Sequence, residues 1–516
     1  MERKSSTEPQ SRRDFIRRAA CAAVGTVALN ATLRDLGFMN AAVAQSNIPA
    51  NDYKALVCIF LAGGNDSNNL IIPTIQSEWN SYSAIRTSVL ALPLSGGPFN
   101  VIPLSPTNSD GHSYGIHPAC PELAAMFNGT GSNTGKLAIL LNAGTLVIPL
   151  TRANYQSSAY AKPPQLFSHA DQVTQWQTSI PNQPPLTGWG GRVADLLASV
   201  QPNAKISMSV TLNGANTFEI GGSSSQYAVS TSGAVSLNGL SSNRLSALTN
   251  ILGVPYSNRQ AQAYANVAAH SINTTTLLNT AILPTADISG SQQFWTTPFP
   301  ASSPFQVTTP TSGTKFNSSL GPQLKMIARL IEAGSKPSNN LLTTDGNPMN
   351  RQIFFCTVGG YDLHTGQTTG NTPSSVVTGA HANLLAELSQ CLNAFQAAMD
   401  QIGALHGDPS FSQRVTAFTA SDFGRTFPSN GLGSDHGWGS HHLISGGAVK
   451  GQQTYGKFPT LAINGPDDTS TGRWIPTTST DQYFSTLATW FGVDSSNLST
   501  IFPNLGNFTT PPPHFI

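Results

Sequence analysis

Three apolar segments of strand length, each followed directly by a loop with an aspartate, constrain the fold of this chain most strongly. The segments are residues 54–61, 352–358 and 415–420. Helical patterns occur between them, and strands that alternate with helices are typical of an α/β fold with a mainly parallel sheet. Because the carboxyl ends of parallel strands meet at one edge of a sheet, we expect the three loops to converge there.

Each of the three loops offers a potential ligand for a metal ion. Asp66 follows the first strand and Asp422 the third, whereas the second strand is followed by both Asp362 and His364. The sequence around Asp66, Gly-Gly-Asn-Asp, is also good turn chemistry, so this residue alone could simply form a turn.

The loop after the third strand contains the densest set of candidate ligands. Asp435, His436, His441 and His442 all follow Asp422 within a glycine-rich stretch. Carboxylates and imidazoles are the ligands of hard and borderline divalent metals. A lone histidine in such a loop is more often solvated or a helix cap, but the number of these side chains favours a site.

Ser168 occupies the expected N-cap position of a helix, in the sequence SHADQ. As a cap it would satisfy backbone donors, and as a nucleophile it would be assisted by the positive end of the helix dipole. The sequence by itself favours the cap.

The remaining pattern predicts one domain from residue 45 to residue 516. Residues 200–345 are rich in Ser, Thr, Gly and Pro, and we interpret them as an elaboration of this domain. A further buried strand is expected at 136–144. Residues 117–122 are expected to start a helix that includes 123–127, and further helices are expected from 169 onward and at 193–200, 259–278, 320–333 and 378–402.

The N-terminus has the features of a twin-arginine signal. Residues 11–16, SRRDFI, precede an alanine-rich stretch at 19–29, and Ala42-Val43-Ala44 offers a cleavage site. We therefore expect residues 1–44 to direct export by the Tat translocase, and the mature protein to be periplasmic or secreted. No later stretch approaches the length of a membrane span, so no stable membrane anchor is expected.

Charge and cysteine content exclude several classes of function. Charged residues make up 10% of the chain, and basic residues do not cluster beyond the N-terminus, so a nucleic acid is not an expected partner. CxxC, CxxCH and strand-linked GxGxxG patterns are absent from the sequence, which argues against an oxidoreductase. Cys58 and Cys356 are expected to be buried free thiols, whereas Cys120 and Cys391 could form a disulfide.

Taken in order, these motifs resemble the exported bacterial family called domain of unknown function 1501. That family is placed by fold with alkaline phosphatases, sulfatases and cofactor-independent phosphoglycerate mutases. The resemblance implies a three-layer, alkaline phosphatase-like fold with helices on both faces of the sheet, and it is weakest over residues 200–345. The motifs that carry it are LVCIFLAGGNDSNNLIIP, HPACPELAAMF, SHADQVTQWQT, GWGGRVADLL, GGYDLHTGQ, SDFGRT, DHGWGSHHLISGGAVKGQQTYGKFP, DQYFSTLATWFGV and IFPNL.

What the resemblance implies for the site is a pair of divalent metal ions, with zinc favoured and manganese, calcium or magnesium as alternatives. The implied ligands are Asp66, Asp362, His364, Asp422, and one or more of His436, His441 and His442, with Asp435 nearby. Ser168 is the implied nucleophile, His169 a contact to the bound anion, and Arg425 or Arg192 the residue that holds the ester oxygens.

Two departures from the superfamily pattern bear on the function. Phe423 stands where the superfamily often has a histidine, so one metal would lack a nitrogen ligand unless His436 supplies it. The context of Ser168 does not match the formylglycine pattern of sulfatases. The expected function is hydrolysis of phosphate or related, sulfate-like esters of a small molecule or polymer. The alternative is a secreted binding or surface-assembly protein with a degenerate or structural metal site.

Overall fold

The computed structural model describes residues 48–49 and 52–516, apart from residues 98, 106–107, 109–110, 132, 134, 185, 235–240 and 283–304. The expected twin-arginine leader, residues 1–44, lies outside the described residues.

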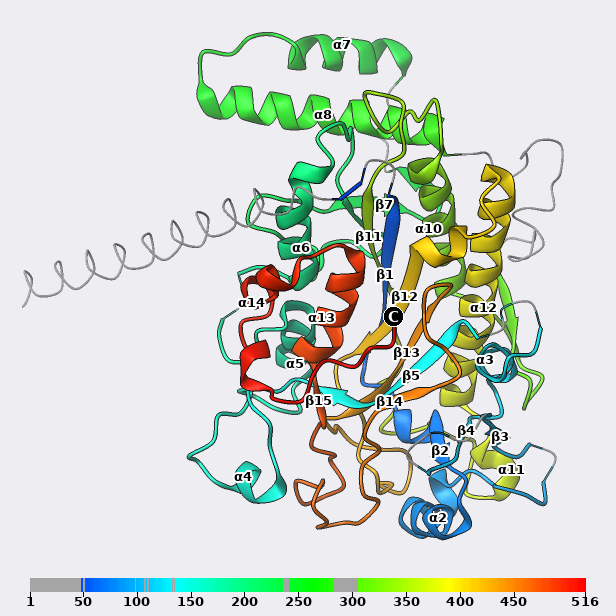
Figure 1. Ribbon diagram of the computed structural model, residues 1–516. Coiled ribbons are helices and arrows are strands. Elements are labelled where there is room, and N and C mark those ends of the chain that lie inside the picture. The colour runs from blue at the N-terminus through cyan, green and yellow to red at the C-terminus, as the bar shows by residue number, and fades with distance from the viewer. Residues whose placement is uncertain are drawn as a thin grey trace, which may run out of the picture.

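A ten-stranded sheet forms the centre of the molecule (Figure 1). The strand order is β14–β5–β13–β12–β1–β11–β6–β7–β8, and β15 pairs with β5. Only β13 and β8 run antiparallel to their neighbours in this sheet, so the expected mainly parallel α/β architecture is confirmed. The strands are β1 (Lys54–Leu61), β5 (Leu137–Gly144), β6 (Ser209–Thr211), β7 (Tyr227–Ser230), β8 (Gly233–Ala234), β11 (Arg351–Val358), β12 (Val415–Ser421), β13 (Ser440–Gly446), β14 (Thr454–Gly456) and β15 (Thr478–Ser479).

The three strands that organise the sequence are neighbours in space. β1 lies between β11 and β12 and is parallel to both. Leu61, the last residue of β1, is in register with Val358 and with Ser421, the last residues of β11 and β12. The loops that follow these strands therefore begin side by side, as the sequence predicts.

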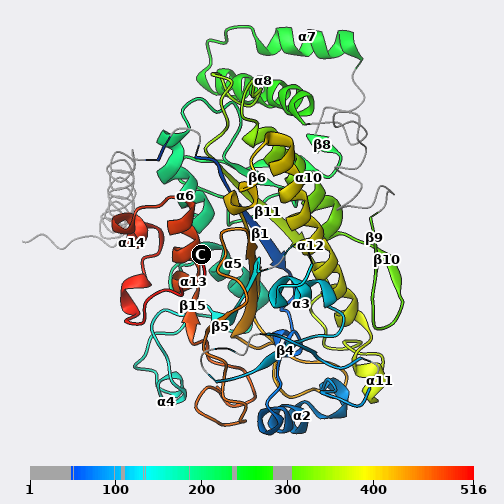
Figure 2. The ribbon, with the colours of Figure 1, turned by 45° about the vertical axis from the view of Figure 1, so that its right-hand side comes forward.

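Helices cover both faces of the sheet (Figures 1 and 2). Residues 55, 57, 59 and 61 of β1 face one apolar core, and residues 56, 58 and 60 face the other, as the alternation of side chains along a strand requires. One face packs against α3 (Pro121–Asn128), α10 (Leu320–Ser335) and α12 (Ala380–His406), and the other against α5 (His169–Thr178), α6 (Trp189–Leu197), α13 (Thr480–Phe491) and α14 (Leu498–Ile501).

Smaller elements lie at the two ends of the sheet. At the end where β1 leads into its loop are α2 (Gln76–Leu90), α4 (Arg152–Gln156), α11 (Pro373–Val376) and the small sheet of β2 (Ile71–Pro73), β3 (Ile102–Pro103) and β4 (Tyr114–Ile116). At the opposite end are α7 (Ser242–Leu252) and α8 (Arg259–Ala281). The pair of β9 (Gln306–Thr308) and β10 (Lys315–Asn317) lies beside α12 (Figure 2). Single 3-10 turns occur at Ser67–Asn69, Ala198–Val200, Phe411–Arg414, Ser495–Asn497 and Leu505–Asn507.

The described residues also show the state of the cysteines and whether any helix could span a membrane. Cys58, Cys120, Cys356 and Cys391 are all buried and free, so Cys120 and Cys391 do not form a disulfide here. None of the described helices is both long and apolar enough to cross a membrane.

Several histidines are buried as neutral groups in the core rather than exposed in loops. His441 and His442 lie in β13, in the middle of the sheet, where every residue of the strand is buried. The ring of His442 packs 4.7 Å from Trp176 and 5.8 Å from Tyr483. Burial lowers the pKa of His441 and of His442 to about 3, and that of His381 to about 4.

These buried imidazoles predict acid destabilisation. The folded pKa lies below the ordinary value of about 6.5, so the unfolded chain binds protons more readily, and stability falls as the pH drops below about 6.5. Each such histidine should reduce the free energy of unfolding by about 2 kcal/mol between pH 7 and pH 5. In urea titrations with metal chelated, His442→Phe should show a pH dependence smaller by about that amount.

The matched control is His514→Gln at an exposed position, which should keep the wild-type pH dependence. An unchanged pH dependence in His442→Phe would mean that His442 is not held neutral by burial.

Candidate metal centre

The loops after β1, β11 and β12 meet because two glycines leave room for them. Gly63 has a φ of +116°, and a Cβ there would lie 2.4 Å from the backbone nitrogen of Asp362. Gly64 has a φ of +82°, and its Cβ would lie 2.4 Å from the ring of Phe423. The Gly63 N–H also donates a hydrogen bond to Asp422 at 3.0 Å. Only glycine combines these backbone angles with so close an approach.

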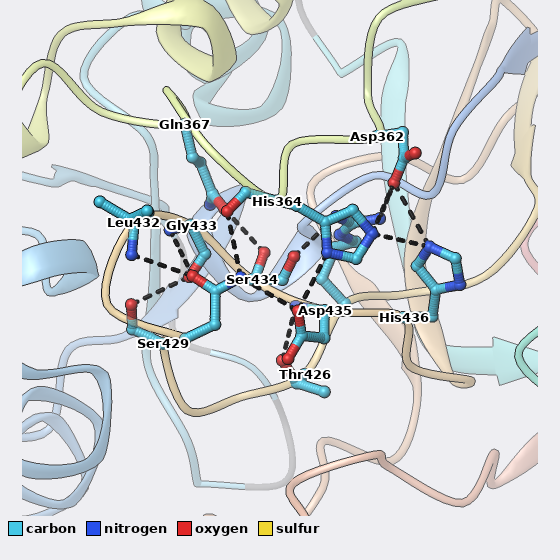
Figure 3. Close-up of polar contacts among 12 residues, drawn as sticks. Asp362, His364, Gln367, Thr426, Ser429, Leu432, Gly433, Ser434, Asp435 and His436 are labelled. Atoms are coloured by element: carbon cyan, nitrogen blue, oxygen red, sulfur yellow. Dashed lines mark hydrogen bonds and ion pairs between the residues drawn. The ribbon is translucent and has the colours of Figure 1, made fainter.

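The loop between β12 and β13 folds back on itself at the same place (Figure 3). Arg425 and His436 form an antiparallel bridge. The Asp435 N–H donates to the Thr426 hydroxyl at 2.9 Å, and the Thr426 N–H donates to the Asp435 carbonyl at 2.8 Å. Asp435 and His436 are thereby held beside the residues that directly follow β12.

Helix α5 contributes a histidine from the start of its first turn. His169 is the first residue of the helix, and Ser168 is its N-cap. The Ser168 hydroxyl donates to the Asp171 carboxylate at 2.6 Å and does not cap the backbone. The His169 ring points the other way, toward the loop after β12, where its Nδ1 lies 2.6 Å from Asp422.

Four side chains bring their donor atoms together. The Nε2 of His436 lies 3.1 Å from that of His169 and 2.9 Å from that of His364. The nearest oxygens of Asp362 lie 3.4 Å from His436 Nε2 and 3.2 Å from His364 Nε2. The Asp362 carboxylate also lies 3.5 Å from His169 Nε2. The ligand atoms of His169, Asp362 and His436 all lie within 4.8 Å of one another, and His364 adjoins this group through His436 and Asp362. Ligands about 2.0–2.1 Å from a tetrahedral zinc ion are roughly 3.3 Å apart, and each of the distances given above is close to that value.

The hydrogen bonds of the three imidazoles determine which nitrogen carries the proton. Each ring uses Nδ1 to contact an oxygen that only accepts, so Nδ1 carries a proton, and in a neutral ring Nε2 then presents a lone pair. The acceptors are the Asp422 carboxylate for His169 (2.6 Å), the Asp435 carboxylate for His364 (2.9 Å) and the Phe167 carbonyl for His436 (2.8 Å).

When the three rings are neutral, three lone pairs and a carboxylate face one another without a hydrogen between them. Such an arrangement is repulsive unless a cation occupies the centre. Metal-binding histidines commonly donate their other N–H to a carboxylate or a carbonyl, as all three do here. The residues present thus fit a single divalent metal ion.

Two groups of the site are held in the protonation state that a metal needs. Burial would raise the pKa of Asp362, but the hydrogen bond and charge of Arg425 lower it below its ordinary value. Arg425 is fully buried, and its Nη1 donates to Asp362 at 2.7 Å. Burial lowers the pKa of His436, although the Phe167 carbonyl opposes this shift. Asp362 is therefore ionised and His436 neutral at neutral pH.

The centre is open to solvent on one side and closed by an aromatic ring on another. The side chains of Asp362 and His364 are 47% and 42% exposed, which leaves access for a ligand. Phe423 is fully buried, and its ring packs 4.8 Å from His169 and 4.7 Å from His436. His436, from the far end of the loop, packs against this ring and directs its Nε2 toward those of His169 and His364.

The structure does not bring all the residues predicted as ligands to this centre. Asp422 and Asp435 contact the Nδ1 atoms of His169 and His364, on the side of each imidazole that faces away from the converging Nε2 atoms. Asp66 is buried and forms an ion pair with Arg86. His441 lies inside β13, where its Nδ1 accepts the backbone N–H of Asn142 at 3.0 Å.

The residues predicted to handle an anion are also placed differently. Arg425 holds Asp362 and is fully buried, and Arg192 is buried and donates to the backbone carbonyls of Ile501 and Thr178. His169, predicted as an anion contact, is instead one of the converging imidazoles. Its place beside the N-cap serine indicated a functional position without specifying which role.

Sequence reasoning missed a buried polar chain that supports the centre. Asp66 accepts hydrogen bonds from Arg86 and Gln367, and the Gln367 side chain accepts the Ser434 hydroxyl at 2.7 Å. The Ser434 carbonyl in turn accepts Arg425 Nη2 at 2.6 Å. The glutamine lies in the GGYDLHTGQ motif, but helix α2, which supplies Arg86, was not predicted.

One part of this chain matches the model of a known protein family. Residues 323–499 match the model of a family described as "Protein of unknown function (DUF1501)". The match includes Asp362, His364 and His436, and it supports the resemblance to that family. No curated protein and no solved structure matches the chain. The wider likeness to alkaline phosphatases and sulfatases stays a prediction.

The contact between Asp422 and His169 Nδ1 predicts that Asp422 supports metal binding. Asp422→Asn keeps the size of the side chain but removes the charge that orients His169 and keeps its Nδ1 protonated. We expect the affinity for zinc, measured by competition with a chromophoric chelator, to fall about 10- to 100-fold.

The matched control is Asp400→Asn, which removes the same charge from a surface pair with Lys136 and should leave zinc affinity unchanged. Equal zinc affinity in Asp422→Asn and the wild type would show that Asp422 does not support the centre.

Proposed function

We propose that this protein is an exported, metal-dependent hydrolase of phosphate or related esters, built on an alkaline phosphatase-like fold. The observation that carries the proposal is the convergence of three imidazole nitrogens and the Asp362 carboxylate on one solvent-accessible point. The mostly parallel sheet, with its candidate site at the carboxyl ends of the strands, supports it because such edges commonly carry active sites.

The donor set favours zinc, with manganese as the alternative. Three nitrogen donors and one oxygen suit zinc, whereas calcium and magnesium prefer oxygen ligands throughout. An open face beside the four donors is the feature that separates a catalytic from a purely structural metal site.

One ion per chain is a better fit to the described residues than the two expected from the sequence. In the part of the chain that the structure describes, one group of His, Cys, Asp and Glu side chains, formed by His169, Asp362 and His436, gathers closely enough to hold an ion, and His364 adjoins it. Asp66, the candidate ligand for a second ion, is neutralised by Arg86 instead.

Each side chain of the centre has a definable part in the proposed reaction. A divalent ion at this point would lower the pKa of a coordinated water and polarise an ester oxygen. Asp422 and Asp435 keep the imidazole Nε2 lone pairs directed at the centre, and Arg425 keeps Asp362 ionised. We propose water, rather than Ser168, as the nucleophile, because the Ser168 hydroxyl is engaged by Asp171.

The proposal includes export by the Tat translocase as a folded protein, to the periplasm or beyond. The support is the twin-arginine pattern at residues 11–16 and the cleavage site ending at residue 44. Hydrolysis of an extracellular ester, of a small molecule or a polymer, fits that location.

Elemental analysis and hydrolysis assays test the function together. The mature protein, purified without chelator or metal-binding tag, should contain about one equivalent of zinc or manganese. It should hydrolyse members of a panel of aryl phosphate, phosphodiester and sulfate esters. Asp362→Ala should lose both the metal and the activity, because an uncompensated set of three neutral imidazoles binds divalent ions less well.

Asp345→Ala, at an exposed loop position, is the control and should retain both properties. A metal-free wild type that takes up no metal on soaking would contradict the proposal. Wild type that holds its metal but cleaves none of the esters would favour the alternative function, a secreted binding or assembly protein with a structural metal.

A further inference from the structure

A second arginine contacts the backbone of a residue that belongs to the candidate metal centre. Arg473 Nε donates to the backbone carbonyl of His436 at 2.8 Å, and its guanidinium lies 4.2 Å from the centroid of the Phe167 ring. His436 supplies one of the converging nitrogens, and Phe167 accepts its Nδ1 proton. The guanidinium therefore contacts the backbone of the residue whose Nε2 faces the centre, and the ring of the residue whose carbonyl accepts its Nδ1 proton.

The loop that presents Arg473 is rigidly built. Asp468 is fully buried, and its carboxylate accepts the backbone N–H groups of Ser470, Gly472 and Arg473 at 2.8–3.1 Å. Asp468 and Trp474 also form an antiparallel bridge. These contacts fix the backbone on both sides of Arg473, and the bond from Nε to the His436 carbonyl together with the Phe167 ring orients the side chain.

The hydrogen-bonding capacity of Arg473 is not used up by the protein. Its Nε is engaged, but Nη1 and Nη2 have no acceptor among the described residues, and the side chain is only partly buried. Arg425 differs, since its Nη groups are bound to Asp362 and Ser434 within the core. Arg192 likewise directs its guanidinium at buried carbonyls. Of these three arginines, Arg473 is the one that can bind a ligand.

Two further side chains with hydrogen-bond donors, Tyr155 and Lys162, lie near this part of the structure. The charge of Arg473 acts on Tyr155, whose pKa is raised by burial and opposed by that charge, so the two side chains are close. The Tyr155 hydroxyl has no hydrogen-bond partner in the described part of the chain. Lys162 Nζ lies 5.4 Å from the centroid of the Tyr155 ring and is held by the Tyr155 carbonyl at 2.8 Å.

The balance of charge shows what Arg473 would contribute. The carboxylates of Asp362, Asp422 and Asp435 against the Arg425 guanidinium leave two negative charges, which one divalent ion cancels. The loaded centre would then be neutral and would have no net attraction for an anion. The Arg473 guanidinium makes the local charge positive.

We propose that Arg473 binds the tetrahedral oxyanion of the substrate beside the metal centre, as the residue that selects for phosphate or sulfate esters. This inference rests on the proposed function. The planar guanidinium, stacked on Phe167 and fixed through Nε, presents its two Nη groups as a fork that matches two oxygens of a phosphoryl or sulfuryl group. The Tyr155 hydroxyl stands near it as a further donor.

Calorimetric titration of inorganic phosphate, and separately of sulfate, into zinc-loaded protein tests the inference without a known substrate. Wild type should bind at least one of the two anions. Arg473→Gln should keep about one zinc per chain and an unchanged melting temperature, yet bind the anion at least about tenfold more weakly. Arg473→Lys, which keeps the charge but loses the fork, should fall between the two.

Arg244→Gln provides the matched control, because it removes the same charge from α7 at the opposite end of the molecule (Figure 1). It should bind both anions as the wild type does. Preference for phosphate or for sulfate in the wild type identifies which kind of ester the site accepts.

The possible failures are distinguishable. Zinc-loaded wild type that binds neither anion, or Arg473→Gln that binds as tightly as the wild type, overturns the role of Arg473 and leaves the metal centre standing. Wild type that binds no metal overturns the proposed function, and the anion site with it.

Discussion

The arrangement of this site depends on one electrostatic constraint: three imidazole nitrogens with lone pairs, and a carboxylate, point at the same small volume. In the neutral rings nothing in the donor set supplies a hydrogen to separate them, since each Nδ1 proton is directed at an acceptor on the outside. A cation relieves the repulsion that the fold imposes. The outer acceptors, the buried Arg425 and the ring of Phe423 are best understood as the structure that maintains this arrangement.

The sheet makes such convergence possible. Three parallel strands end in register, and the two glycines after β1 allow their loops to approach within van der Waals contact. The hairpin-like return of the β12–β13 loop adds His436, and α5, from the helical layer on one face, adds His169. Arg473 comes from the loop between β14 and β15, so the site joins segments that are far apart in the chain. No single segment could form it alone.

Much of this framework was predictable from the sequence, because buried parallel strands are continuous apolar runs and the aspartates directly follow them. β1 has the predicted ends, and Asp362, His364 and His436 lie together as neighbours. The roles of the other residues were not predictable, since ligands and their supporting acceptors are the same residue types. Asp422 resembles a ligand in sequence but orients His169, and Asp66 has a buried partner, Arg86, on a helix that shows little amphipathic pattern. His441 and His442 follow glycines, as loop residues do, but belong to a buried strand.

Anomalous diffraction from a crystal of the zinc-loaded protein, recorded on both sides of the zinc absorption edge, tests the central claim most directly. We expect one zinc peak per chain, about 2.0–2.2 Å from the Nε2 atoms of His169, His364 and His436 and from an Asp362 oxygen. A zinc ion bound instead by Asp66, or by the side chains of β13, would contradict this assignment, as would a second ion of equal occupancy. So would imidazoles whose Nε2 atoms turn away from one another with no ion between them.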